Sequence, residues 1–518
     1  MEDKAMELIK ENVTVNQVCC KGSVRTLLDE DIIVPDVKPD ILKILQLDAT
    51  ACVTGKTVSD GRATVNGRTS LKILYIPDSE AESIKSILTS FDFTENIDNK
   101  NISANMKALV TANVENAEFT LINSRKLRVR VTVCLDYEIV EEKNIEIAVD
   151  ATEADKAEIL KETVTLQNCV GLCESDFTLK DTIEIPLSQS AVNEVLKADA
   201  RITDTEYKCV TGRVTARGAA VVSVLYTDEE NTIRFMEAEI PFTEVFDCPD
   251  ATDDTSCDID YCVSDISFSV EEDSDGDRRI IAVQIDVTAQ IKAAENAVID
   301  IISDCYEPYM TTELIKETAQ LEEIVSRPVV QNTIRETIEP DSGSPAVTGI
   351  YGAAVKPVVT NTDIHGDKLL CEGKIETYIL YVTDSPEYPV YSVKRDIPFS
   401  CALDAEASGD DLMPEIKAEV KHTAYNLNMS GGIEIRCVLS VSANVVRKRD
   451  IDLIGDVLSD MTDDGSKRGI VIYFVQPGDT LWEIAKRYAV PQEDIVSFNN
   501  LEDAAMLPIG SRLLIPGI

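Results

Sequence analysis

The sequence offers few side chains in the spacings that catalytic or metal-binding groups adopt. The pairs Cys169–Cys173 and Cys257–Cys262 are loosely spaced like thiolate ligands, but no histidine lies near either pair. The two histidines, His365 and His422, are far apart in the sequence and have no evident nucleophile beside them. We therefore predict no catalytic residues, no metal site and no cofactor, and we expect the cysteines to be free thiols that pack as small apolar side chains.

The acidic run Glu271–Asp277 could in principle bind calcium. An EF-hand loop has glycine at its sixth position and glutamate at its twelfth. A loop that began at Asp273 would instead place Gly276 fourth and Gln284 twelfth. The run is better explained as a solvated hairpin turn.

Composition excludes several classes of protein. The 518 residues include 93 Asp and Glu against 49 Lys and Arg, which gives a net charge of −44. Such a charge argues against binding nucleic acid or anionic lipid, where Lys and Arg replace counterions. No secretory signal and no apolar run long enough to span a membrane is visible, so we expect a cytoplasmic protein of several domains.

One block of sequence recurs three times. It reads GRTSLKILYIPD at 67–78, GAAVVSVLYTDE at 218–229 and GKIETYILYVTD at 373–384. A second block and a third aromatic follow in register in each copy. The shared aromatic positions are Tyr75, Tyr226 and Tyr381, then Phe93, Phe242 and Phe399, then Phe119, Phe268 and Tyr425. Three internal repeats of one domain are indicated.

Each copy shows the period of a β-strand. Apolar residues occupy every second position from Leu127 to Ile139, and similar alternation follows in the other copies. Turn residues precede these strands at Asn123-Ser124, 274–276 and Gly431-Gly432. The pattern predicts a mainly β fold with three sandwich-like repeats.

Helices are expected between the repeats. The segments 151–162 and 311–327 are rich in Ala, Glu, Leu and Lys, and residues 4–12 resemble them. These segments favour linker helices packed on a sheet, with partner docking as the alternative. The expected domains are 1–150, 151–302 and 303–455 for the repeats, a linker at 456–469, and a separate domain at 470–518.

The C-terminal segment has a different pattern, with the order β-α-α-β. A short strand and the turn at Gln476–Asp479 precede a helix that starts at Thr480, where Thr480 and Glu483 fit a capping box. Pro491 suits the first turn of a second helix at 491–498. A final strand covers 512–516.

These residues resemble a LysM domain over 473–516, from the opening VQPGDTLWEIAKRY to the closing LPIGSRLLIP. Three β-rich repeats followed by a LysM domain resemble the SPOCS-domain spore-coat assembly proteins of spore-forming clostridia. The resemblance implies a role in coat assembly on the mother-cell side of the forespore surface. The implied partners are the morphogenetic ATPase of the coat basement layer and other coat proteins.

LysM domains bind N-acetylglucosamine polymers in a shallow groove between two loops. Carried over to this sequence, the groove involves Gly478, Asp479, Thr480 and Leu481 on one side and Leu507, Pro508, Ile509 and Gly510 on the other. The same residues could simply form the turns that the fold needs. Trp482 could stack on a sugar, but its place on the helix favours a core position.

Two functions remain open at this point. The favoured hypothesis is a non-enzymatic scaffold that docks coat proteins through its LysM domain and β-rich repeats. The alternative is binding of peptidoglycan or another N-acetylglucosamine polymer by the LysM domain, with the repeats as spacers. The absence of a visible export signal favours the first hypothesis.

Overall fold

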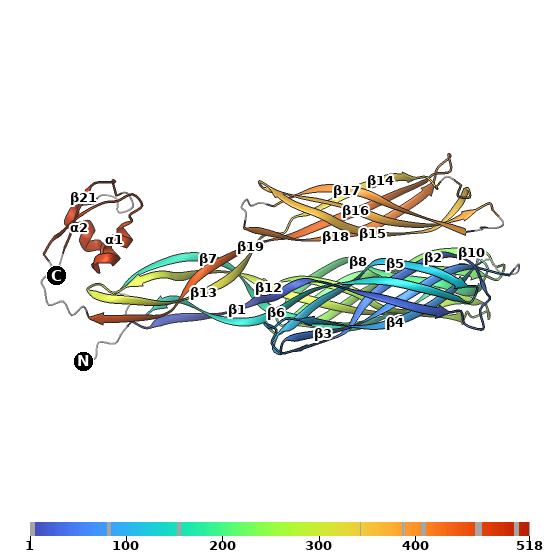
Figure 1. The fold of residues 1–518 in the computed structure, drawn as a ribbon, viewed down its shortest axis with the longest axis horizontal. Coiled ribbons are helices and arrows are strands. Elements are labelled where there is room, and N and C mark those ends of the chain that lie inside the picture. Colours follow the sequence, from blue (N-terminus) through green and yellow to red (C-terminus); the bar gives the residue numbers. More distant parts are fainter. Residues whose placement is uncertain are drawn as a thin grey trace.

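The computed structural model describes residues 6–79, 84–152, 157–341, 343–385, 388, 390–405, 411–461, 469–501 and 507–516. Three similar β-sandwiches follow one another along the chain, as the repeated blocks predicted. Figure 1 shows that the long axes of the three sandwiches run in the same direction. A small domain with two helices lies at the end of the molecule where both chain termini are found.

The first repeat contains six antiparallel strands in two sheets. One sheet has the order β1-β6-β5 and the other the order β2-β3-β4. The strands are β1 (Leu8–Ile33), β2 (Ile41–Ser59), β3 (Arg62–Pro77), β4 (Lys85–Asp98), β5 (Lys107–Asn123) and β6 (Lys126–Ala151). The alternating apolar residues of β6 are buried between the two sheets, so the period-two pattern marks the core face.

The second repeat has the same topology, with sheets β7-β12-β11 and β8-β9-β10. Its strands are β7 (Glu158–Glu184), β8 (Val192–Val210), β9 (Arg213–Asp228), β10 (Ile233–Asp247), β11 (Ser256–Glu272) and β12 (Arg278–Tyr306). The acidic run lies where predicted, in the hairpin between β11 and β12. There the Asp273 carboxylate accepts hydrogen bonds from the backbone N–H groups of Asp275 and Asp277 at 2.9 and 3.0 Å.

The third repeat differs only in its first strand, which is divided in two. Pro328 lacks an N–H for the ladder, and the strand breaks beside it into β13 and β14. Both pieces pair with β19, which also pairs with β18, while β15, β16 and β17 form the second sheet. The bounds are β13 (Met310–Ser326), β14 (Val329–Ile338), β15 (Val347–His365), β16 (Lys368–Thr383), β17 (Val390–Asp404), β18 (Leu412–Leu427) and β19 (Ile433–Met461).

The repeated sequence blocks are explained by one contact. In every repeat the conserved block begins with a glycine that lies opposite the repeat phenylalanine on the neighbouring strand, and the ring covers it. A β-carbon would lie 2.2 Å from Phe93 Cζ at Gly67, 2.8 Å from Phe242 Cζ at Gly218 and 2.6 Å from Phe399 Cζ at Gly373. Only glycine leaves room for the ring, which is why the two blocks occur together. The tyrosines Tyr75, Tyr226 and Tyr381 are fully buried nearby.

The predicted linker helices are wrong. Residues from 8 onward form β1, residues from 158 onward form β7, and Met310–Ser326 is strand β13. Residues 4–5 and 153–156 of the expected helices lie outside the described part of the chain. The helix-favouring composition is overridden because each segment pairs along its length with the last strand of its own repeat, β6, β12 or β19.

These long strand pairs extend beyond the sandwiches as three two-stranded ribbons. We call the ribbons together the stalk; it comprises 8–18 with 140–151, 158–169 with 294–306, and 310–326 with 445–461. Figure 1 shows the ribbons reaching the end of the molecule that carries the termini. They share a core with side chains from all three repeats: Val13, Val15, Ile147, Val164, Leu166, Ile301, Leu321 and Leu453. The repeats are therefore joined by sheet and not by helix.

The C-terminal domain has the predicted β-α-α-β order. Its elements are β20 (Val471–Phe474), α1 (Leu481–Tyr488), α2 (Gln492–Asn499) and β21 (Arg512–Ile515), and β20 pairs antiparallel with β21. The closing strands of the repeats end at Ala151, Tyr306 and Met461. Residues 456–461 of the expected linker therefore belong to β19, and residues 462–468 lie outside the described part of the chain.

Candidate functional site: the C-terminal domain and its contact with the stalk

The loop between β20 and α1 is fixed by its own polar groups. Thr480 caps α1: its hydroxyl accepts from the N–H of Glu483 at 3.2 Å, and the Glu483 carboxylate accepts from the N–H of Thr480 at 3.2 Å. The capping box is thus confirmed. The Asp479 carboxylate accepts from the Tyr473 hydroxyl at 2.6 Å and from the Gln476 N–H at 2.7 Å. These hydrogen bonds, that of Tyr473 first, lower the pKa of the Asp479 carboxyl.

The two loops of the predicted groove lie side by side. Val475, which leads into the first loop, receives a hydrogen bond from the N–H of Gly510 at 2.8 Å and donates its own N–H to Ser511 at 3.0 Å. Gly478 and Gly510 have φ values of 92° and 80°, so each turn needs the left-handed conformation that glycine adopts easily. The sequence therefore identified two segments that the fold brings together.

The groove residues differ in how far they can reach a ligand. Gly478, Thr480, Pro508, Ile509 and Gly510 are exposed, and the Ile509 side chain is 69% exposed. Asp479 and Leu507 are half-buried. Leu481 is only 6% exposed and packs in the domain core, so its side chain cannot cover a ligand. The groove surface is made by exposed backbone and by Ile509.

Trp482 packs, partly buried, against the core of the domain, and it also contacts the stalk. Its ring lies against Tyr306 at the end of β12, with ring centroids 5.2 Å apart in an edge-to-face arrangement. Its indole Nε1–H donates to the Asp304 carboxylate at 2.8 Å, and the Lys486 ammonium pairs with the same carboxylate. The side chain thus attaches α1 to the stalk.

The second helix is attached to the stalk as well. The Tyr306 hydroxyl donates to the Val490 carbonyl at 3.0 Å, and burial raises the pKa of Tyr306. The Tyr309 hydroxyl donates to Asp494 at 3.0 Å. Glu158 of β7 accepts from the backbone and the side-chain amide of Gln492, both at 3.1 Å. The helical face is therefore occupied, while the two groove loops remain accessible.

An apolar surface on the far side of this domain was missed by the sequence reasoning. Ile470, Ile472 and Phe474 are 59%, 55% and 55% exposed, and we call them the β20 face. Val471 and Tyr473 alternate with them and pack toward the helices. The signal was present in the sequence: the run IVIYFV at 470–475 is apolar on both faces, whereas a strand with one solvated face alternates with polar residues.

The described residues contain no cluster of three or more His, Cys, Asp or Glu side chains able to hold a metal ion. Every cysteine is a free thiol, and burial raises the pKa of the Cys169 thiol to about 11. His365 pairs with Asp363 at 3.0 Å, while His422 lies on β18. Among the described helices none is long and apolar enough to cross a membrane.

Together, three β-sandwich repeats on a common stalk and a small β-α-α-β domain with an open groove define a multidomain binding protein. Comparison with protein families agrees. The family described as "SipL, SPOCS domain" matches residues 40–122, 191–271 and 347–428, and the LysM domain family matches residues 473–516. The chain is a SipL-type protein with three SPOCS domains and a C-terminal LysM domain, as the sequence resemblance indicated.

Both families are binding domains and not catalytic families. LysM suggests binding of peptidoglycan or a related glycan, and the SPOCS domains suggest a role in sporulation. Searches of curated proteins and of solved structures find no match to the chain.

Proposed function

We propose that this protein is a non-enzymatic scaffold for spore-coat assembly that works on the mother-cell side of the forespore surface. Its LysM domain binds a coat protein, with the morphogenetic ATPase of the basement layer as the first candidate. The stalk then holds the three acidic repeats at that place, where they recruit further coat proteins. Attachment through one domain raises the local concentration of the repeats and gives avidity to weak contacts.

The observation that carries this proposal is the β20 face. Its three neighbouring apolar side chains are each more than half exposed. Their contact with water is unfavourable, so covering them with a partner makes the free energy of binding more favourable. They lie on the sheet face turned away from the helices, and the helices are held by the stalk. The LysM domain thus offers a protein partner an apolar surface that the described residues of its own chain leave uncovered.

A second candidate function, glycan binding, is favoured by the open groove. The exposed backbone at Gly478 and Gly510 offers N–H and C=O groups to acetamido substituents, and Ile509 offers an apolar contact for a sugar face. This function uses a different part of the same domain, so single substitutions separate the two candidates.

The experiment compares three variants of the full chain: Phe474→Lys on the β20 face, Ile509→Lys in the groove, and Ile315→Lys on the stalk. Ile315 is a matched control because it is also an exposed apolar residue. Each variant is purified by affinity from sporulating cells and is separately sedimented with purified peptidoglycan. We expect Phe474→Lys to lose the coat ATPase while both other variants keep it.

Loss of the ATPase in Ile509→Lys alone would move the protein contact into the groove. The scaffold proposal would be overturned in favour of glycan binding by two results together. Neither the unmodified chain nor the control would capture the ATPase, and the chain would be retained on peptidoglycan unless it carried Ile509→Lys.

A further inference from the structure

The second sheets of the three repeats meet through their central strands, β3, β9 and β16. Leu74, Leu225 and Leu380 occupy the same position in each repeat, immediately before the repeat tyrosine, and they meet in one buried cluster. Ile84, Ile233 and Val390 also occupy one equivalent position in the three repeats, and they belong to the same buried cluster. The cluster closes one end of the space between the repeats.

Next to this cluster lies a cavity of about 630 Å³ that all three repeats line. Its walls come from β2 and β5 of the first repeat, β8 and β9 of the second, and β15 and β16 of the third. A volume of this size suits a small organic molecule. The third repeat has Ala354 in its wall where the other two have Asp48 and Asp199, each lying four residues after the partner of the repeat tyrosine.

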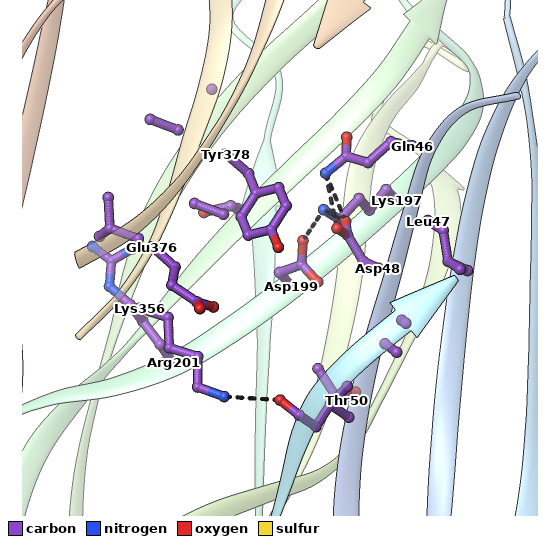
Figure 2. Close-up of a pocket in the computed structure, with 18 of the residues that line it drawn as sticks. Gln46, Leu47, Asp48, Thr50, Lys197, Asp199, Arg201, Lys356, Glu376 and Tyr378 are labelled. Carbon is purple, nitrogen blue, oxygen red and sulfur yellow. Dashed lines mark hydrogen bonds and ion pairs between the residues drawn. The ribbon is translucent and has the colours of Figure 1, made fainter. Parts of the chain in front are cut away.

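One wall of the cavity carries charges that are already paired. Lys72 bonds Asp199 at 2.6 Å, and Lys197 pairs with Asp199 at 2.9 Å and with Asp48. Figure 2 shows Lys197 between the two carboxylates. Burial raises the pKa of Asp199, but Lys197 and Lys72 outweigh it and lower that pKa overall. These groups join the first and second repeats and have little capacity left for a ligand.

The facing wall carries cations without such partners. The Lys356 ammonium donates to the Val114 carbonyl at 3.3 Å, and the Lys394 ammonium lies 4.9 Å from the centre of the Tyr378 ring. Neither has a carboxylate within 4.0 Å among the residues that the structure describes. The nearby acids are held elsewhere: Glu376 by Lys374 at 2.9 Å and Glu115 by Arg25 at 2.7 Å.

This wall is unusual for a chain with a net charge of −44. Carboxylates are abundant enough to pair every lysine, yet two exposed ammonium groups of one sheet face the cavity without an ion-paired carboxylate among the described residues. Both lie on the same face, since Lys356 is opposite Glu376 and Lys394 is opposite Tyr378, two residues along the central strand. Arg201 of the second repeat adds a third cation, and its nearest carboxylate is Glu237 at 3.7 Å.

We propose that the cavity binds a small organic anion of metabolite size. A carboxylate or phosphate group of the ligand meets Lys356 and Lys394, with Arg201 opposite. The apolar part lies against Leu225, Phe235, Tyr351 and Leu380, and the Tyr378 ring covers one side. A bound anion would touch all three repeats at once and so stabilise their arrangement.

The test uses two fluorescent probes that share a ring system, anionic anilinonaphthalene sulfonate and neutral phenylnaphthylamine. Both are titrated into the full chain, and native mass spectrometry counts the bound molecules. The variants are Lys356→Glu, Lys394→Glu and Ala354→Trp, which adds bulk at an exposed position of the cavity wall. Arg335→Glu on exposed β14 is the control, because it changes the net charge equally away from the cavity.

We expect one anionic probe per chain, bound about tenfold more tightly than the neutral probe, as one additional charge-assisted contact provides. Each lysine variant should weaken the anionic probe about tenfold, Ala354→Trp should prevent binding of both probes, and Arg335→Glu should change nothing. Equal affinity for the two probes, or unchanged anion binding in the lysine and Ala354→Trp variants, would overturn the proposal. Circular dichroism confirms that each variant is folded. The site is distant from the LysM surfaces, so its failure leaves the scaffold proposal untouched.

Discussion

The Asp304 carboxylate makes two of the contacts between the LysM domain and the stalk, and replacing it should weaken docking of the domain. Asp304 receives a hydrogen bond from the Trp482 indole at 2.8 Å and an ion pair from Lys486. A hydrogen bond to a charged group contributes about 1.5–3 kcal/mol. Because the Asp304 side chain is still 21% exposed and solvent screens the pair, about 2 kcal/mol is a reasonable total for Asp304→Ala. The ratio of docked to undocked domain should fall about 30-fold.

The assay is built into the sequence, since Trp482 is the only tryptophan. In the docked state its ring packs on Tyr306 and its N–H is bonded, so undocking exposes it to water. Acrylamide quenching and the emission maximum, followed through a urea titration, report this step separately from unfolding of the repeats. Asp304→Ala should lose the protected tryptophan at lower urea and show stronger quenching and a red-shifted emission.

The stalk supplies a matched control. Asp150, Asp304 and Asp456 occupy equivalent places at the ends of the three ribbons, and each accepts the N–H of the next residue, at 3.0, 3.0 and 2.9 Å. Asp456→Ala therefore removes the same local contact without touching the LysM domain. Equal quenching in the unmodified chain, Asp304→Ala and Asp456→Ala would refute the reasoning, because the domain would then be held by other contacts or not held at all.

Three further predictions follow from the fold. Gly218→Ala should destabilise the second repeat by about 1–3 kcal/mol in urea unfolding, since the new methyl group overlaps the Phe242 ring. The added change Phe242→Leu should recover part of that loss. If the two changes were fully additive in the double variant, the contact would not be the cause. Thr480→Ala should lower LysM stability by about 1 kcal/mol by removing the cap of α1, seen as an earlier change in Trp482 fluorescence, and an unchanged curve would mean that the cap is dispensable. Burial raises the pKa of the Cys305 thiol from 9.0 to about 11, so unfolding releases a proton above pH 9 and stability should fall as pH rises from about 9 to about 11. Urea midpoints measured under reducing conditions give the slope of stability against pH, which Cys305→Ala should flatten. An equal slope in both proteins would exclude this thiol as a cause.

Local patterns in the sequence were sufficient for the repeats and the LysM domain. Alternation from Leu127 to Ile139 identified a core strand, and the capping box at Thr480 located a helix, because both patterns depend on neighbours a few residues away. The fold class, the repeats and the LysM domain were therefore predictable.

The linker helices failed because the deciding partners are distant in sequence. Met310 pairs with Met461 and Glu158 with Tyr306, so the ladders that turn these helix-favouring segments into strands are closed by residues about 150 positions away. No local pattern contains that information. The role of Asp304 was invisible for the same reason, since it lies at an expected domain boundary and its partners lie in the LysM domain.

The two loops that carry the predicted groove residues lie side by side, but the exposure of one of those residues could not be predicted. The resemblance marked Leu481 as a groove residue, and only the three-dimensional packing reveals that its side chain is inside. Which side chains face a ligand depends on packing between elements, which spacing alone does not specify.

The stalk also has a consequence for how the protein is made. Its core takes side chains from the first and last strands of every repeat, and β19 ends at Met461. During synthesis the first ribbon pairs early, but it keeps an uncovered apolar side until the third ribbon has left the ribosome. Only then does the end of the stalk exist as a complete surface, and the LysM domain follows the third ribbon in the chain. Docking of that domain therefore reports that all three ribbons have been made, and a product truncated before the third ribbon would leave the stalk open to aggregation and proteolysis.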